Sequence, residues 1–408
     1  MGVFSAFKDK RAKRNNETPT VGEHYTKLGR RSAFIRYAII ILIVIFAIYS
    51  LSFHSNEITI ENFRYMLKFI NVNEEAETPV GTKIAFDGSS GNRGLAFKGD
   101  LAVLNESGLA VTGWDSEVIL RESFSLDHPK ITENGINLFC YDLGGKELRI
   151  FNSYSLLSEI QFDYPIYWLA ASKSGSFAAV SSAKGYRSAV YVYDKEFRLT
   201  YSRLLGDKYV DFVDISHDGE EFVTAAHYSE DGNIVTLATR VRVDSEDAVS
   251  QQKFIGEIPL GIYYTENGYC LMTSDKMRMF DGEDNIIGEV SFGDKDLLSG
   301  RIYGERILVT YAMEGLSGGT EAIIYRLDGS VEYTHVFENS LSDSVIIGDT
   351  LYALSPGTLS ECMINGDTIL YDIPTSYSSL VSDENKLILF SENQAEVFTK
   401  ESFYIKSE

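Results

Sequence analysis

Histidine and cysteine are the residue types here most able to bind a metal or act as a base or nucleophile. The chain has six histidines and three cysteines. No histidine has a second histidine at metal-ligand spacing, and no CxxC pair occurs. The best candidate polar cluster combines His217 and His227, which could meet across a hairpin with Asp214 or Asp218 nearby. Turn and surface roles explain these four residues better. We therefore assign no catalytic, cofactor-binding or metal-binding residue.

Other signals of known chemistry are weak. No H-E-x-x-H, G-x-G-x-x-G or Walker sequence occurs. The segment DGEDN (281–285) has the composition of a calcium loop without its spaced ligands and downstream glutamate, so an ordinary hairpin is the better interpretation. Cys140, Cys270 and Cys362 lie far apart, which favours buried apolar thiols over a disulfide plus one free thiol. The sequence thus predicts no cofactor.

Composition limits the fold and the partners. Tyrosine (25) and phenylalanine (24) are plentiful while proline (7) is scarce, and this favours strands. The formal net charge of -22 argues against a nucleic-acid partner, because an acidic surface repels phosphates. Positions 1–36 hold nine Lys/Arg against three Asp/Glu, a net charge of +6, so a short basic segment precedes a long acidic body.

An apolar run lies at the boundary between these two parts. Residues 34–53 have about the length of helix that crosses a bilayer core, and they predict one transmembrane helix. The chain then divides into a basic cytoplasmic tail (1–33), the transmembrane helix (34–53), a stalk or linker (54–81) and an extracytoplasmic domain (82–402). Its expected partner through 34–53 is the lipid bilayer.

The basic tail also predicts the topology. Lysine and arginine cluster before the apolar run, which places the N-terminus in the cytoplasm and the large domain outside the cell membrane. Whether the helix is ever cleaved stays open, since Ser50-Leu51-Ser52 offers small residues at plausible positions for a signal peptidase.

After Gly81 the sequence is a series of short apolar or alternating runs separated by turn residues, which is typical of strands and tight turns. Asn105-Glu106, Glu283-Asp284 and Asp328-Gly329 stand where hairpin loops are expected. Three segments match one another best, each placing a serine and turn residues before an apolar strand: AASKSGSFAAV (170–180), DISHDGEEFVT (214–224) and LVSDENKLILF (380–390).

The repeat divides the domain near residues 127, 164, 208, 258, 296, 340 and 377, into units of roughly 32–50 residues, the length of a four-stranded propeller blade. We therefore predict an all-β domain, a seven- or eight-bladed β-propeller, preceded by the single N-terminal transmembrane helix. A strand near residues 83–86 is expected to complete the last sheet and close the ring.

These features resemble known families. The Ser-x-Asp-Gly turn at 216–219 is similar to the blade turns of TolB-like and WD-repeat-like propellers. The whole layout, with GLAVTGW (108–114), HPKI (128–131) and YRSAVYVYD (186–194), resembles a Gram-positive bacterial single-pass membrane family classed as domain of unknown function 5711. That resemblance implies an extracytoplasmic propeller and supplies no catalytic residues. Trp114-Asp115 is the only Trp-Asp pair, so the scaffold role of eukaryotic WD repeats is not transferred.

The sequence therefore predicts a function only as a class. We expect a membrane-anchored propeller that is a binding or scaffold module, not an enzyme, with an envelope protein or other envelope component as partner on the propeller face. We expect the contact on the face that carries the inter-blade loops. The alternative is an enzyme acting on envelope polymers or small extracellular substrates, with its site at the mouth of the propeller channel.

Overall fold

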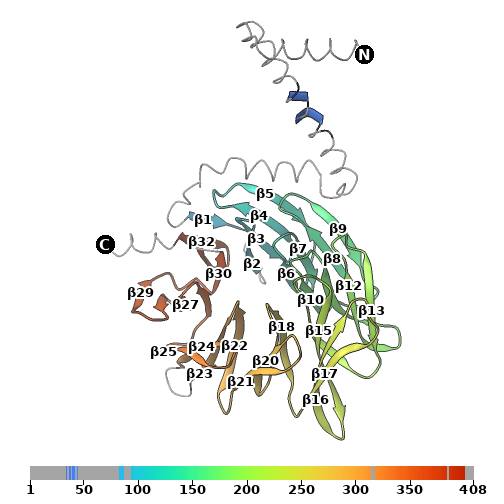
Figure 1. Cartoon of the computed structure of the whole chain (residues 1–408). Helices are drawn as coiled ribbons and strands as arrows, with labels where there is room; N and C mark the ends of the chain where they lie inside the picture. Colours follow the sequence, from blue (N-terminus) through green and yellow to red (C-terminus); the bar gives the residue numbers. More distant parts are fainter. Residues whose placement is uncertain are drawn as a thin grey trace, which may run out of the picture. The chain divides into compact units, whose positions relative to one another are not determined.

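The computed structural model describes residues 34, 36–37, 39–41, 44, 82–86, 93–313, 318–383 and 386–399. The chain forms two compact units, Met1–Glu74 and Glu75–Glu408. In the first unit the described residues are helical, and their apolar side chains are exposed, as at Phe34 and Ile41. The second unit is a β-propeller (Figure 1).

The predicted transmembrane helix over residues 34–53 is corrected. A helix needs about 20 consecutive, mainly apolar residues to cross a bilayer core, and no helix in the described part of the chain is long and apolar enough. Three predictions depended on this helix and are not supported either. They are the single-pass topology, the cell-membrane localisation with a cytoplasmic N-terminus, and the bilayer as partner. The expected tail (1–33) and stalk (54–81) lie outside the described residues.

Eight four-stranded antiparallel sheets form the propeller, so the structure decides between seven and eight blades. Blades 1 to 4 contain these strands: β2 (Arg93–Phe97), β3 (Asp100–Asn105), β4 (Gly108–Gly113) and β5 (Val118–Ser123); β6 (Pro129–Glu133), β7 (Leu138–Asp142), β8 (Glu147–Phe151) and β9 (Leu156–Gln161); β10 (Trp168–Ala171), β11 (Phe177–Ala183), β12 (Tyr186–Tyr193) and β13 (Leu199–Leu205); β14 (Tyr209–Ile215), β15 (Glu221–Glu230), β16 (Asn233–Arg242) and β17 (Ala248–Ile255).

Blades 5 to 8 continue the pattern with these strands: β18 (Pro259–Thr265), β19 (Gly268–Thr273), β20 (Lys276–Asp281) and β21 (Ile286–Ser291); β22 (Asp296–Tyr303), β23 (Arg306–Ala312), β24 (Thr320–Arg326) and β25 (Val331–Phe337); β26 (Asp343–Ile347), β27 (Thr350–Ser355), β28 (Thr358–Met363) and β29 (Thr368–Asp372); β30 (Ser379–Asp383), β31 (Lys386–Phe390), β32 (Gln394–Thr399) and β1 (Thr82–Ala85). Each predicted division falls at, or a few residues before, the first strand of a blade.

The strands of a blade are named a to d from the centre of the ring outward. Neighbouring blades meet mainly through their a strands, such as β10 with β14 and β14 with β18 (Figure 1). Antiparallel pairing then places all a–b and c–d turns at one end of the propeller, which we call the a–b rim. The b–c turns and the d–a connections between blades lie at the other end, the d–a rim.

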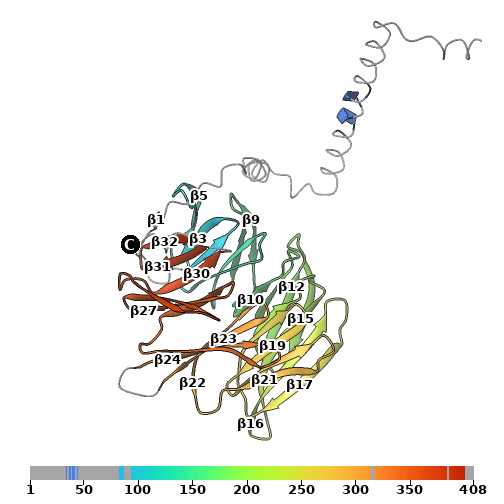
Figure 2. The ribbon, with the colours of Figure 1, turned by 60° about the vertical axis from the view of Figure 1, so that its left-hand side comes forward.

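The ring is closed by the two ends of the domain. β1 pairs with β32 in register Thr82↔Val397 to Ala85↔Gln394, and so forms strand d of blade 8 (Figure 2). Ile84 is almost fully buried there, beside Leu101, Ile388 and Val397. The prediction that a strand near residues 83–86 completes the last sheet is therefore confirmed.

The core lies between the sheets, which explains the sequence pattern of each strand position. Strand b is buried on both faces and reads as a continuous apolar run, as in β3, where every side chain is buried. Strand d has one covered and one solvated face, so β17 alternates strictly between exposed and half-buried positions. Cys140, Cys270 and Cys362 are free and buried in strands b and c, which confirms the prediction of buried apolar thiols.

Candidate functional site

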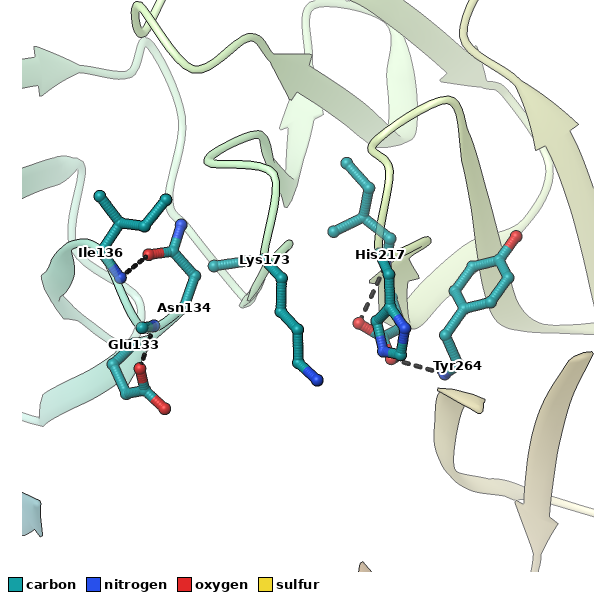
Figure 3. A pocket seen from close by; sticks show the side chains of 10 residues that line it. Glu133, Asn134, Ile136, Lys173, His217 and Tyr264 are labelled. Carbon is teal, nitrogen blue, oxygen red and sulfur yellow. Dashed lines mark hydrogen bonds between the residues drawn. The ribbon is translucent and has the colours of Figure 1, made fainter. Parts of the chain in front are cut away.

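A concave site lies at the a–b rim over four consecutive blades. It has a volume of about 470 Å³, and its walls come from the a–b turns of blades 2, 3 and 4 and from strand β18 of blade 5. We call it the turn pocket. The side chains discussed below are Glu133, Ile136, Lys173, His217 and Tyr264, which are labelled in Figure 3, and Asp214.

Hydrogen bonds from the Ser172 side chain connect the a–b turns of blades 3 and 4. The Ser172 hydroxyl lies 2.7 Å from the carbonyl oxygen of Ser216 and 2.9 Å from that of His217. The backbone amide of Ser174 also donates to the His217 carbonyl, at 3.2 Å. These bonds fix the backbone under Lys173 and His217, so both side chains start from defined positions.

The two turns are also built alike. The amide of Gly175 donates to the carbonyl of Ser172, and the amide of Gly219 donates to that of Ser216. Both glycines have positive φ, 99° and 78°, which an L-residue adopts only with strain. Lys173 and His217 therefore occupy the same position of two successive repeats.

Blade 2 supplies the opposite wall. The Asn134 side-chain oxygen accepts the amides of Ile136 (3.0 Å) and Asn137 (2.8 Å), a local turn that asparagine favours. The Glu133 carboxylate accepts the amide of Gly135. This arrangement leaves Ile136 at the tip with 45% of its surface exposed.

Asp214 joins blade 4 to blade 5 at the base of the pocket. Its carboxylate accepts the amides of Ile215 at 2.9 Å and Tyr264 at 2.7 Å. Burial raises the pKa of Asp214 to about 6, although both amide hydrogen bonds act in the opposite direction. The carboxylate is thus engaged with backbone and is not a free acidic group at the surface.

Lys173 differs from the pocket's carboxylates because it has no internal partner. Its side chain extends between the Glu133 loop and His217 (Figure 3). It is exposed and forms no ion pair or hydrogen bond with another described residue through its ammonium group. The turn pocket therefore presents an uncompensated cation on a chain whose net charge is -22.

A second concavity adjoins it. About 360 Å³ in volume, it lies between blades 4 and 5 and shares His217 and Tyr264 with the turn pocket. We call it the side pocket. Arg240, bound to Asp284 at 2.6 Å and Glu221 at 3.2 Å, closes one side. Its lining carboxylates, which outnumber that arginine, are Asp218, Glu221, Glu266 and Asp281.

The four residues singled out from sequence do not form one cluster. His227 is paired with Tyr209 at the far end of the β14–β15 hairpin from His217, at the d–a rim. There its Nδ1 lies 2.6 Å from Asp211, and its ring stacks on Tyr209 at 5.3 Å. His217, Asp214 and Asp218 do lie together beside the two pockets.

The DGEDN segment is the c–d turn of blade 5, as the hairpin interpretation predicts. Asp281 accepts the amides of Glu283 and Asn285 through one oxygen. Within the described residues no group of three or more His, Cys, Asp or Glu side chains could hold a metal ion.

Sequence reasoning missed Lys173, Ile136 and Tyr264. A signal for the first was present: aligning AASKSGSF with DISHDGEEF places Lys173 and His217 in the same column after the shared serine. Nothing in the sequence pairs Ile136 or Tyr264 with them, because the turn of blade 2 and strand β18 meet the other two turns only when the four blades pack side by side.

A family model described as "Family of unknown function (DUF5711)" matches residues 73–399. The chain belongs to this family. No curated protein matches the chain in sequence. The DUF5711 chain is similar in fold to a structure of the Dos1 propeller, with 11% identity and a TM-score of 0.56, over 78% of this chain and 94% of that chain.

It is also similar to the crystal structure of the C-terminal WD40 domain of Sif2. The identity is 13% and the TM-score 0.55, with 78% of this chain and 98% of that chain covered. A WD40-like propeller is thus the fold of this DUF5711 member, although its sequence holds a single Trp-Asp pair.

Proposed function

We propose that this propeller is a non-catalytic protein-binding module that takes a segment of a partner protein in the turn pocket. The observation that supports this proposal is the construction of the pocket. Turns from consecutive blades are held by backbone and serine hydrogen bonds, and they present Lys173 and Ile136 outward without an internal partner. A rigid site with exposed, unpaired groups loses little conformational entropy on binding, because its loops are already ordered.

The size of the site agrees with this role. A volume of about 470 Å³ falls in the range of small-ligand and side-chain pockets. The site also lies at the a–b rim, opposite the inter-blade connections where the sequence led us to expect the contact. The proposal therefore places the partner on the a–b rim.

Photocrosslinking from two matched positions tests the proposal. A photoreactive phenylalanine replaces Ile136 in one full-length variant and Tyr186 in another; these side chains are 45% and 44% exposed. Tyr186 begins strand β12 and lies at the d–a rim. We expect a discrete crosslinked protein from position 136 in living cells and none from position 186.

A captured protein supports the proposal only if it binds the purified chain and Ile136→Asp weakens that binding. Circular dichroism and the thermal unfolding midpoint establish that both crosslinking variants are folded. Crosslinks from position 186 alone, or from neither position, would overturn the proposal.

A further inference from the structure

We propose that the partner segment is recognised through a single carboxylate side chain, seated between Lys173 and His217, next to an apolar residue that packs on Ile136. This inference rests on the proposed function and names the chemistry of the ligand. It concerns a linear peptide segment, not a nucleic acid or a phosphorylated one.

The unpaired ammonium group of Lys173 argues for one anionic group on the ligand. Two carboxylates line the pocket, and backbone amides hold both in place without neutralising their charge: Glu133 accepts the amide of Gly135, and Asp214 accepts those of Ile215 and Tyr264. Neither forms an ion pair with Lys173, in contrast to Glu289, which pairs with Lys276 at 2.7 Å. A single anionic group from outside the chain would complement Lys173.

The position of the cation argues for a specific contact. Lys173 and His217 follow equivalent serines in adjoining turns, and those turns are bonded to each other through Ser172. The ammonium group and the imidazole therefore line the same pocket from two adjoining blades (Figure 3). A carboxylate there can accept hydrogen bonds from both, and hydrogen bonds to charged groups are about twice as strong as neutral ones.

The neighbouring side pocket limits the charge of the ligand. On the far side of His217 and Tyr264, its carboxylates include Asp218 and Glu266, and only Arg240 opposes them. A phosphate cluster or a run of acidic residues would bring further negative charge against this wall. One carboxylate satisfies Lys173 and avoids that repulsion.

The apolar part of the pocket argues for a peptide over a free organic acid. Ile136 projects from blade 2, and Ala171 and Ile215 line the same cavity. The volume of about 470 Å³ exceeds what one carboxylate fills. An apolar residue beside the acidic one would cover Ile136 and exclude water from the ion pair.

Selection from a random 12-residue phage-displayed peptide library, against the full-length chain, tests this inference. Wild type is compared with Lys173→Glu and with Lys184→Glu, which changes the charge equally. Lys184 is exposed in the b–c turn of the same blade, at the d–a rim. Wild type and Lys184→Glu should enrich peptides with one Asp or Glu beside an apolar residue, and Lys173→Glu should lose them.

Synthetic versions of an enriched peptide give the magnitude. Replacing its acidic residue by the matching amide should weaken binding about tenfold, as expected for loss of one charged hydrogen-bonding group. Capping its C-terminus as an amide should leave binding unchanged, because the side chain supplies the carboxylate. The reverse pattern would identify a terminal carboxylate and overturn the side-chain assignment.

The outcomes separate this inference from the proposed function. Enriched peptides that bind at position 136, carry no acidic position and tolerate Lys173→Glu would overturn the carboxylate inference and leave the binding module standing. Peptides whose binding is insensitive to both Ile136→Asp and Lys173→Glu, or no enrichment at all, would count against both.

Discussion

Asp214 shows how a single residue links stability to pH in this fold. Its carboxylate is buried between blades 4 and 5, and its pKa is raised to about 6 by that burial. The folded state therefore holds this proton more tightly than the unfolded chain, in which the pKa is about 3.9. The resulting contribution to stability is complete below about pH 4 and is lost as the pH rises through about 6.

Substitution Asp214→Asn should change the pH dependence of unfolding in a defined direction. Asparagine cannot ionise, so its own contribution does not change with pH. Its Nδ2 cannot accept one of the two backbone amides that Asp214 accepts, and this loss is the same at every pH. Between pH 4 and pH 7 the difference in unfolding free energy, variant minus wild type, should shift in favour of the variant by up to about 3 kcal/mol. Urea denaturation at several pH values measures this difference; a difference that is constant or moves the other way contradicts the assignment.

Arg278 illustrates a buried ion pair. Its guanidinium binds Glu257 through two bonds of 2.7 Å, and only 6% of the Arg278 side chain is exposed. Glu257 lies in the connection from blade 4 to blade 5, where it also accepts the Thr273 hydroxyl at 2.6 Å. The hydrogen bond from Arg278 is the main cause of the lowered pKa of Glu257.

Arg278→Met should destabilise the propeller by about 3 to 5 kcal/mol, because it leaves the Glu257 carboxylate buried without its cation. The double variant Arg278→Met, Glu257→Gln should recover part of this loss, since it removes the uncompensated charge. Chemical denaturation of the two variants checks the prediction. Equal losses in both would show that packing of the arginine, not its charge, is what matters.

At the scale of elements, two glycines at the a–b rim of blade 5 differ in how closely the backbone surrounds them. Gly268 starts strand β19 behind the side pocket, and a Cβ built there would lie 1.9 Å from the backbone oxygen of Phe280. Gly282, in the c–d turn of the same blade, has its nearest atom at 3.7 Å.

Gly268→Ala should therefore destabilise the protein by about 1 to 3 kcal/mol, as overpacked sites do, while Gly282→Ala should change stability by less than about 0.5 kcal/mol. Thermal unfolding of both variants provides the comparison. A Gly268→Ala protein as stable as its control would mean that the turn of blade 5 can shift away from β20.

The elements were largely predictable, and the site only in part. Aromatic and apolar runs, separated by turn residues, predicted the blades and the closing strand, because each strand position has its own burial pattern. The repeated serine turns also carried the information that Lys173 and His217 are equivalent. The pairing of His217 with His227 was wrong because β14 and β15 are long enough to place these residues at opposite rims. The apolar run at 34–53 predicted a transmembrane helix from composition alone, and the structure corrects it.

At the scale of the whole molecule, strand β1 closes the ring by completing the sheet of blade 8. Ile84 is 2% exposed, and it packs against blade 1 and blade 8 through Leu101 and Ile388. Lys83 is the preceding residue of the same strand and is exposed.

Ile84→Ala should lower the free energy of unfolding by about 2 to 4 kcal/mol through the cavity that it leaves, and Lys83→Ala should have little effect. Because an opened ring exposes the edge of β32, the Ile84 variant should also self-associate at high protein concentration. Denaturation and light scattering test the two consequences. An Ile84→Ala protein with wild-type stability would contradict the role of β1 in closing the ring.

The same pairing has a consequence for synthesis on the ribosome. Thr82 leaves the exit tunnel early, but its partner Val397 is among the last residues of the domain to be made. Chains grow at about 5–20 residues per second, so β1 waits for tens of seconds as an unpaired strand while the first seven blades assemble beside it. Over that interval the nascent chain carries a free edge at each end of an open arc, and a chaperone that covers such edges would act on this protein before its last strand emerges.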